Sequence, residues 1–210
     1  MSVNTPGMMI IISSPSGAGK TTIVKLLSEK FNYRISISHT TRKPRIDELD
    51  AKDYFFISKL EFNNLIKKKY FIEHAQVFEN LYGTSKDQVI SNLKKGKNIL
   101  FDIDWQGAKQ IRNKNFKYKL LTFFILPPSK KELLNRLYKR ESNNSEIVMQ
   151  RMKNFKEDVL HWEDYDFVVI NDNVERCYKE IYTQIENFKI GKKLNKNNKL
   201  IIQHVKNLIN

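Results

Sequence analysis

The segment with the clearest chemistry is residues 9–22, which read MIIISSPSGAGKTT: an apolar run, a stretch of small residues, and then Lys20 and Thr21. Glycines in such a stretch let backbone N–H groups turn inward around an anion, and the start of the following helix favours negative charge. Lys20 can reach terminal phosphates, and the Thr21 hydroxyl can hold Mg²⁺. The segment therefore predicts a phosphate-binding loop. Its expected ATP-side residues are Ser13, Ser14, Pro15, Ser16, Gly17, Ala18, Gly19, Lys20, Thr21 and Thr22.

Position 14 departs from the strict form of this loop. The pattern G-x-x-x-x-G-K-[ST] has glycine there, and this chain has Ser14. A small residue still permits the turn, and the apolar run before the loop and the helical pattern after it supply the expected context. An ordinary Gly/Ser-rich turn with one lysine is the alternative interpretation.

The elements that must position this loop alternate between strand and helix. Short apolar or aromatic runs, typical of buried parallel strands, lie at residues 8–12, 98–103, 121–126 and 167–170, with a further short strand at 34–38. Helical spacing of apolar residues covers residues 20–31, 130–140 and 146–162. This alternation predicts an α/β fold, in which a parallel sheet carrying the phosphate loop is flanked by helices.

Residues 39–84 interrupt the alternation with turn and strand signals and one helical stretch near residues 60–68. We interpret them as an insertion suited to a second substrate. The polar loop at 141–145 joins two predicted helices and has the composition of a hinge. The tail is rich in lysine and asparagine, but its apolar residues predict a docked terminal helix. They are Leu200, Ile201, Val205 and Leu208.

Composition limits the remaining classes. The chain has 210 residues, of which 40% are hydrophobic, enough for one domain with its own core. The single Cys177 excludes an internal disulfide framework and fits a reducing compartment. Membrane-length apolar runs and a charged signal segment are absent from the sequence, so we expect a cytoplasmic protein without a membrane partner. The net charge of +14 comes mostly from scattered lysines, which indicates a solvated surface and not a nucleic-acid site.

Three further segments point to one family: residues 36–56 (SISHTTRKPRIDELDAKDYFF), 71–85 (FIEHAQVFENLYGTS) and 99–108 (ILFDIDWQGA). With the phosphate loop before them and ILPPS and YDFVVIND after them, they resemble guanylate kinase over nearly the whole chain and in the right order. The resemblance implies transfer of the γ-phosphoryl group of Mg·ATP to GMP, with dGMP as a further expected acceptor. The products are ADP and GDP, and the role is guanine nucleotide supply.

The resemblance also implies how guanine is selected. Guanine presents donors at N1 and N2 that a carboxylate can accept together, whereas adenine has an acceptor at N1. The family pattern places Glu73 and Asp104 at these donors, with Ser38 and Thr84 around the base. Such a site discriminates strongly, because the wrong base leaves buried charge unpaired. Taken alone, Glu73 would be interpreted as a surface carboxylate.

The GMP phosphate is assigned by the resemblance to Arg42, Arg45, Tyr54 and Tyr82, with Glu48 in the same GMP site. Guanidinium geometry suits a multi-oxygen anion better than an ammonium group does. An isolated R-x-x-R would be interpreted as a basic surface turn.

Arg136, Arg140 and Arg151 match lid arginines of the family, which close over the transferring phosphoryl group, neutralise its charge and exclude water. Arginines at i and i+4 are by default a solvated helix face. The family places glycine after the second lid arginine and this chain has Glu141, which puts lid flexibility or local electrostatics in question.

Asp102, at the end of an apolar run, is expected to hold Mg²⁺ partly through water, together with Thr21. Such an aspartate is otherwise commonly a helix cap. Asn171 and Asp172 match the adenine-side segment of the family, where a second aspartate usually follows and this chain has Asn173.

The resemblance implies a single domain over residues 1–210. Its parts are a core (1–38, 85–135 and 153–190), a GMP-binding insertion (39–84), a lid (136–152) and a tail (191–210). The expected catalytic residues are Lys20, Arg42, Arg136, Arg140 and Arg151. The expected partners are ATP and GMP, with neither nucleic acid nor membrane, and a homo-oligomer stays open.

Two other functions compete with this one. A different nucleoside monophosphate kinase would share the phosphate loop and lid, but the Glu73 and Asp104 pair argues against an adenine acceptor. Guanylate-kinase-like scaffold modules bind peptides after losing the ATP site, whereas Lys20, Thr21 and the lid arginines are intact here. Nucleic-acid binding is a distant third, since no basic stripe interleaved with stacking aromatics is evident.

Overall fold

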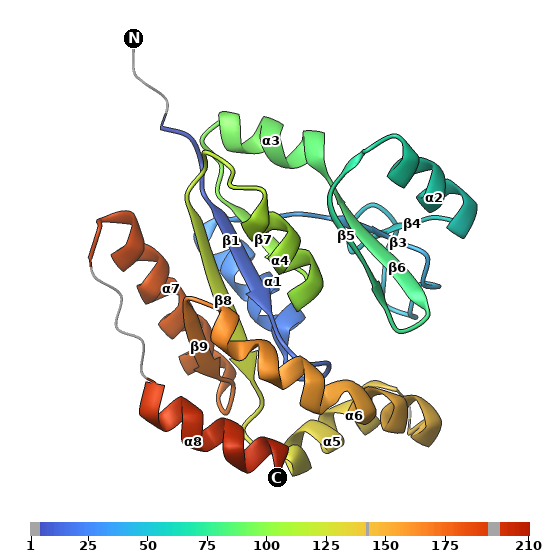
Figure 1. Ribbon diagram of the computed structural model, residues 1–210, viewed down its shortest axis with the longest axis vertical. Coiled ribbons are helices and arrows are strands. Elements are labelled where there is room, and N and C mark those ends of the chain that lie inside the picture. The colour runs from blue at the N-terminus through green and yellow to red at the C-terminus, as the bar shows by residue number, and fades with distance from the viewer. Residues whose placement is uncertain (1–4, 142, 193–197) are drawn as a thin grey trace. The chain divides into compact units, whose positions relative to one another are not determined.

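The computed structural model describes residues 5–141, 143–192 and 198–210 (Figure 1). Residue 142 of the predicted hinge, residues 193–197 of the tail and residues 1–4 lie outside the described part. Contacts within the chain define two compact units. Unit 1 comprises Met1–Ile10 and Tyr33–Leu120, and unit 2 comprises Ile11–Asn32 and Leu121–Asn210.

The fold is α/β, as predicted, with a five-stranded sheet in the order β2-β7-β1-β8-β9 and a four-stranded sheet in the order β4-β3-β6-β5. Strand β1 (Met9–Ser13) begins in unit 1 and ends in unit 2. All five of its residues are buried, which agrees with the continuous apolar run that predicted it.

Unit 1 holds the four-stranded sheet, the parallel pair β2–β7 and three helices. The strands are β2 (Arg34–Ile35), β3 (Ser38–Thr40), β4 (Phe55–Phe56), β5 (Phe71–Val77), β6 (Asn80–Ser85) and β7 (Ile99–Asp102). The helices are α2 (Lys59–Lys67), α3 (Lys86–Lys94) and α4 (Trp105–Asn113). Helix α2 starts at a capping box, in which Ser58 and Glu61 satisfy each other's backbone N–H groups, and it buries Phe62 completely.

The insertion predicted at 39–84 is therefore a sheet with one helix, and the stretch expected near 60–68 is α2. The single strand predicted at 34–38 is wrong in one respect, because the chain divides it into β2 and β3, which belong to different sheets. Ser36 ends the first pairing: its N–H and its hydroxyl both donate to the Leu100 carbonyl, at 2.8 and 3.2 Å. The chain then leaves β7, and Ser38 pairs with Thr84 in β6.

Unit 2 contains β8 (Leu120–Leu126) and β9 (Phe167–Ile170), which pair in parallel. Its helices are α1 (Lys20–Phe31), α5 (Lys130–Arg140), α6 (Ser145–Leu160), α7 (Val174–Lys189) and α8 (Asn198–Ile209), with a 3-10 turn η1 (His161–Asp164) after α6. The helices predicted at 20–31 and 130–140 have these bounds in the structure. The helix predicted at 146–162 ends at Leu160, where the chain tightens into η1.

The terminal helix is present as predicted, with one correction. Ile201, Val205 and Leu208 lie one helical turn apart and are at most 9% exposed, whereas Leu200 is 69% exposed. Successive residues of a helix point about 100° apart, so Leu200 points away from the buried face that Ile201, Val205 and Leu208 share. Helix α8 packs on α6 (Figure 1), and the His204 ring donates to the Pro127 carbonyl at 2.8 Å. Within the described ranges, we find no helix with the length and apolar character needed to span a bilayer.

Candidate active site

The phosphate loop lies between the end of β1 and the start of α1, and two of its glycines are required by geometry. Gly17 and Gly19 have φ values of 89° and 95°, in the left-handed region that side-chain-bearing residues rarely adopt. A Cβ on Gly19 would lie 2.3 Å from Asn171 Nδ2, and a Cβ on Gly17 would lie 2.9 Å from Leu137 Cδ2. The packing therefore demands glycine at both positions, and at position 19 the sequence pattern demands it as well.

The N-terminus of α1 is suited to an anion. Gly19 is the N-cap residue and has no side chain with which to cap the helix, and the first turn carries no acidic residue. The first N–H groups of a helix have no intrahelical acceptor, and the helix dipole favours negative charge beside them. Lys20 begins the helix, and Thr21 and Thr22 follow as exposed residues. These are the groups expected to surround phosphates.

The loop is held from behind by Asn171. Its Nδ2 donates to the Ala18 carbonyl at 2.8 Å, and its own carbonyl accepts a hydrogen bond from Arg136 at 3.2 Å. Asn171 is only 1% exposed. The contacts within unit 2 therefore give Asn171 a role in fixing the phosphate loop, and its contact with adenine stays a prediction.

Asp172 and Asn173, the other adenine-side residues, act at the start of α7. Asn173 is the N-cap residue, and its Oδ1 accepts from the Arg176 N–H at 3.0 Å. Asparagine and aspartate cap helices about equally well, so this departure from the family pattern is neutral for the helix. Asp172 is exposed and pairs with the Arg176 guanidinium, which keeps the pKa of that carboxyl below its ordinary value.

All three lid arginines reach the phosphate loop directly, Arg136 by donating to the Ala18 carbonyl at 3.5 Å. Arg140 and Arg151 both donate to the Ser16 hydroxyl, at 3.0 and 2.7 Å. They come from α5 and α6, which pack against each other on either side of the predicted hinge. Arg136, one turn before Arg140, forms an ion pair with Glu132 at 2.9 Å. Unit 2 thus gathers all three predicted lid cations around one loop.

Glu141 places a negative charge between Arg140 and Arg151. Its Oε1 accepts from Arg140 Nε at 2.9 Å and from Arg151 at 3.2 Å, and its side chain is only 10% exposed. The two arginines that meet at Ser16 are therefore also bridged by a carboxylate. From the sequence, Glu141 was only a departure from the family pattern. In the structure, it is a carboxylate of the chain itself that binds two arginines beside the predicted phosphate site.

Glu141→Gln is expected to lower the Kd for ATP about threefold, because incoming phosphates no longer compete with a carboxylate for Arg140 and Arg151. Titration of nucleotide binding measures the change, and Glu175→Gln, which removes an exposed carboxylate paired with Lys179 on α7, is the matched control. Weaker ATP binding in Glu141→Gln would show instead that the carboxylate assists the nucleotide by holding the arginines in place.

The guanine-side residues lie in unit 1, in one row across three strands. Ser38 in β3 is opposite Thr84 in β6, and Thr84 is opposite Glu73 in β5. The Thr84 hydroxyl donates to Glu73 Oε1 at 2.6 Å, so the 3.1 Å contact between the two hydroxyls has Ser38 as its donor. All three residues are buried, and Glu73 is 2% exposed. A register shift between Phe71 and Glu73 sets the direction of this carboxylate.

Asp104 joins this row through the first turn of α4. It is the N-cap residue of α4, and its Oδ1 accepts from the Gly107 N–H at 3.0 Å. A Cβ on Gly107 would lie 2.5 Å from Glu73 Oε2. The two carboxylates predicted to read guanine therefore flank the same backbone position, and only glycine fits there.

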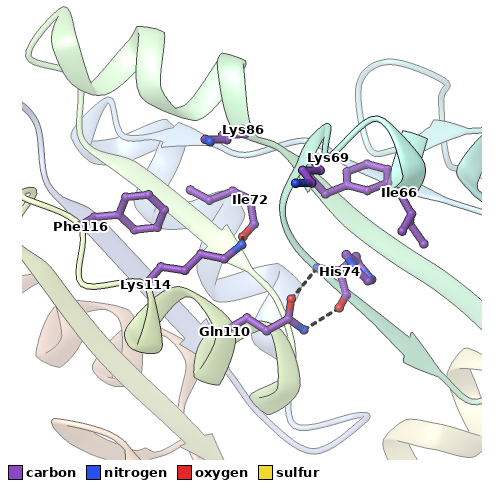
Figure 2. A pocket seen from close by; sticks show the side chains of 9 residues that line it. Ile66, Lys69, Ile72, His74, Lys86, Gln110, Lys114 and Phe116 are labelled. Atoms are coloured by element: carbon purple, nitrogen blue, oxygen red, sulfur yellow. Dashed lines mark hydrogen bonds between the residues drawn. The ribbon is translucent and has the colours of Figure 1, made fainter. Parts of the chain in front are cut away.

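The contacts that fix this arrangement were not predicted from the sequence. Strand β5 is the outer strand of its sheet, and three side chains at four-residue spacing along α4 bond to it. Gln106 donates to the Gln76 carbonyl at 3.0 Å, and Lys114 donates to the Ile72 carbonyl. Gln110 accepts from the His74 N–H at 3.2 Å and donates to its carbonyl at 2.6 Å, as Figure 2 shows. The i, i+4, i+8 spacing of Gln106, Gln110 and Lys114 was the signal in the sequence that these side chains share one side of a helix. That spacing does not show which strand they contact.

The predicted GMP phosphate residues form a second cluster in unit 1. Glu48 accepts from Arg42 at 2.8 Å and from Arg45 at 3.1 Å, so it positions both guanidinium groups. The Arg42 guanidinium lies 5.4 Å from the Tyr54 ring centre, and the Tyr54 and Tyr82 rings meet edge to face. Burial, followed by the charge of Asp102, raises the pKa of Tyr54, which keeps this hydroxyl protonated and able to donate.

The residues expected to hold Mg²⁺ lie in different units. Thr21 belongs to the first turn of α1 in unit 2, and Asp102 ends β7 in unit 1. In the part of the chain that the structure describes, no three His, Cys, Asp or Glu side chains form a metal-binding group. The residues present fit Mg²⁺, because this ion is usually bound through one or two protein oxygens, with substrate phosphates and water completing its shell.

An α/β fold whose first strand leads through a glycine loop into a helix, with arginines gathered on that loop, defines a P-loop phosphotransferase. Comparison with known proteins gives the family. A family model described as guanylate kinase matches residues 7–188. The chain belongs to the guanylate kinase family, whose known activity is ATP:GMP phosphotransfer.

Individual relatives agree with this assignment. The chain is 42% identical to a guanylate kinase of Buchnera aphidicola subsp. Baizongia pistaciae over 209 residues, which cover 97% of this chain and 98% of that protein. It is 44% identical to one of Rickettsia felis over 183 residues, 87% of this chain and 94% of the relative. The crystal structure of guanylate kinase from Anaplasma phagocytophilum superimposes with a TM-score of 0.71 at 30% identity, covering 96% of this chain and 94% of that one.

Proposed function

We propose that this chain phosphorylates GMP, and dGMP as well, with Mg·ATP as the donor, and that unit 1 binds the acceptor and unit 2 the donor. The observation that carries the proposal is the buried row from Ser38 through Thr84 to Glu73, with Asp104 beside it. A buried carboxylate that already accepts one hydrogen bond still has lone pairs for two more donors. Guanine N1 and N2 supply such donors, and adenine N1 would repel the carboxylate.

The phosphoryl transfer is assigned to groups that position and neutralise charge. Lys20 and the N-terminus of α1 bind the ATP phosphates, and Arg42 and Arg45, oriented by Glu48, bind the GMP phosphate. Arg136, Arg140 and Arg151 stabilise charge on the transferring group. Mg²⁺, held by Thr21 and through water by Asp102, would neutralise charge on the phosphate oxygens. No imidazole base is needed, because this reaction depends on positioning and electrostatics.

The division into core, GMP-binding insertion and lid carries a proposal about motion. Both nucleotides must enter and leave, yet water must be excluded while the phosphoryl group moves. We assign this closing to the insertion at 39–84 and the lid at 136–152. We place the reaction in the cytoplasm, where ATP and GMP are available and where the buried, unpaired Cys177 stays reduced.

A coupled ADP-release assay with Mg·ATP tests the proposal against the other nucleoside monophosphate kinases. GMP is expected to exceed AMP, CMP and UMP in kcat/KM by a factor of about 10³, with dGMP between them. Equal rates with AMP would contradict the assignment of Glu73 and Asp104. No turnover with any acceptor, in protein that binds GMP, would favour a binding module.

A further inference from the structure

Unit 1 contains a cavity that the nucleotide assignments leave unused. It has a volume of about 460 Å³ and lies beside β5, between the end of α2 and the ends of α3 and α4 that face it (Figure 2). Pockets of 300–1,000 Å³ typically hold small molecules, and the volume of this one lies within that range. Its lining residues include none of the predicted ATP or GMP contacts.

The cavity is lined by three cations and by no carboxylate. Lys69, Lys86 and Lys114 reach it from three different segments, after α2, at the start of α3 and at the end of α4. Within the described part of the chain, neither Lys69 nor Lys86 forms an ion pair. Like charges around one space repel each other, and an anion between them would remove that repulsion. Burial, and then the charge of Lys86, lowers the pKa of Lys114.

The backbone at Lys69 adds a second observation. Its φ is 54°, and it directly follows the C-cap residue of α2, a position where glycine is the usual residue. The Lys69 N–H bonds to the Ile66 carbonyl at 2.9 Å, which fixes the turn. A left-handed backbone conformation costs free energy for a lysine, and in this conformation the Lys69 side chain lines the cavity.

The remaining wall is apolar and aromatic. Phe71, Phe116 and Ile72 line the cavity, and Phe116 lies across from Lys69 in Figure 2. His74 completes the lining. Burial, and then the charge of Lys114, lowers the pKa of His74, so this ring is neutral at pH 7 and can hydrogen-bond without adding charge.

We propose that this cavity is a second, non-catalytic site for an organic phosphate that carries a planar ring, with the phosphate between Lys69, Lys86 and Lys114 and the ring against Phe116. Ammonium groups bind phosphate oxygens as point charges, and aromatic faces bind planar rings. The proposal does not depend on which nucleotide the catalytic site accepts.

The test must occupy the catalytic site first. The protein is saturated with a bisubstrate inhibitor in which adenosine and guanosine are joined through a polyphosphate, and AMP, pyrophosphate or adenosine is then titrated in a calorimeter. We expect one further site for AMP and weaker binding of pyrophosphate, because the ring contributes contact with Phe116. Adenosine, which has no phosphate, is expected to give no signal. Binding of the bisubstrate inhibitor is measured first and by itself. If the inhibitor does not bind, the proposed function fails at that step, and the result is distinguished from a failure of the second site.

Lys69→Gln/Lys86→Gln is expected to weaken AMP binding at this site about tenfold or more, since two charge-assisted contacts are lost. Lys94→Gln/Lys109→Gln, which removes the same charge from exposed positions of α3 and α4, should leave it unchanged, and neither variant should alter the KM for GMP. Equal loss in the two variants would show that binding follows net charge, and no signal in the wild type would likewise overturn the proposal.

Discussion

Lys20→Ala is expected to retain the fold and to lose about 10³-fold in kcat, the loss typical of removing one preorganised charge from a transition state. Lys20 begins α1 directly after Gly19, which has a left-handed backbone conformation. The first turn of α1 carries no acidic side chain, so no carboxylate there weakens the attraction between the Lys20 ammonium group and the phosphates. The lysine ranks above the lid arginines because three arginines share the lid's role. Circular dichroism and turnover are measured on the same sample.

Lys25→Ala, which changes an exposed lysine five residues further along α1, is the control for that variant and should keep normal turnover. Near-normal turnover in Lys20→Ala itself would reject the assignment of the phosphate loop. A loss of both helicity and turnover would instead place Lys20 among the structural residues of unit 2.

Glu73→Gln is expected to raise the KM for GMP about 10²-fold, because a neutral amide cannot accept both guanine N–H groups with charge-assisted strength. The structure makes the substitution more severe than the sequence implied. Glu73 Oε1 already accepts from Thr84, and Oε2 lies against the backbone of Gly107. An NH₂ group at the Oε1 position would require the Thr84 hydroxyl to turn from donor to acceptor, and an NH₂ group at the Oε2 position would meet the crowded backbone of Gly107.

Saturation curves for GMP and for ATP distinguish the outcomes. Only the GMP curve should shift in Glu73→Gln, and Glu79→Gln, an exposed glutamate in the connection between β5 and β6 of the same sheet, should shift neither. An unchanged GMP curve in Glu73→Gln would mean that guanine is recognised by other residues.

Local chemistry explains which parts of the fold could be predicted. The helix at 20–31 begins directly after the glycine loop, and the helix at 130–140 begins after the Ser129 cap. The start of each helix is therefore determined by residues next to it in the sequence. The strand at 34–38 failed because its division depends on which of two sheets each half joins, and that choice lies in distant strands. The outward position of Leu200 likewise depends on where α6 lies.

The candidate site shows the same division. The resemblance to guanylate kinase predicted Glu73, Asp104 and the lid arginines as site residues, but not the side chains that orient them. The bridging contacts of Glu141 require α5 and α6 to be packed, and the row of Gln106 and Gln110 requires β5 to lie beside α4. Long-range packing decides such contacts, so a single sequence predicts the reacting groups better than their supports.

The bonds from α4 to β5 have a consequence for solubility. An outer strand presents unpaired N–H and C=O groups that can template pairing with another chain and so lead to aggregation. On β5, the outward carbonyls of Ile72, His74 and Gln76 are occupied by side chains of the chain itself. Side chains satisfy these groups without extending the sheet, so the helix that carries Asp104 also closes this edge against intermolecular β-pairing.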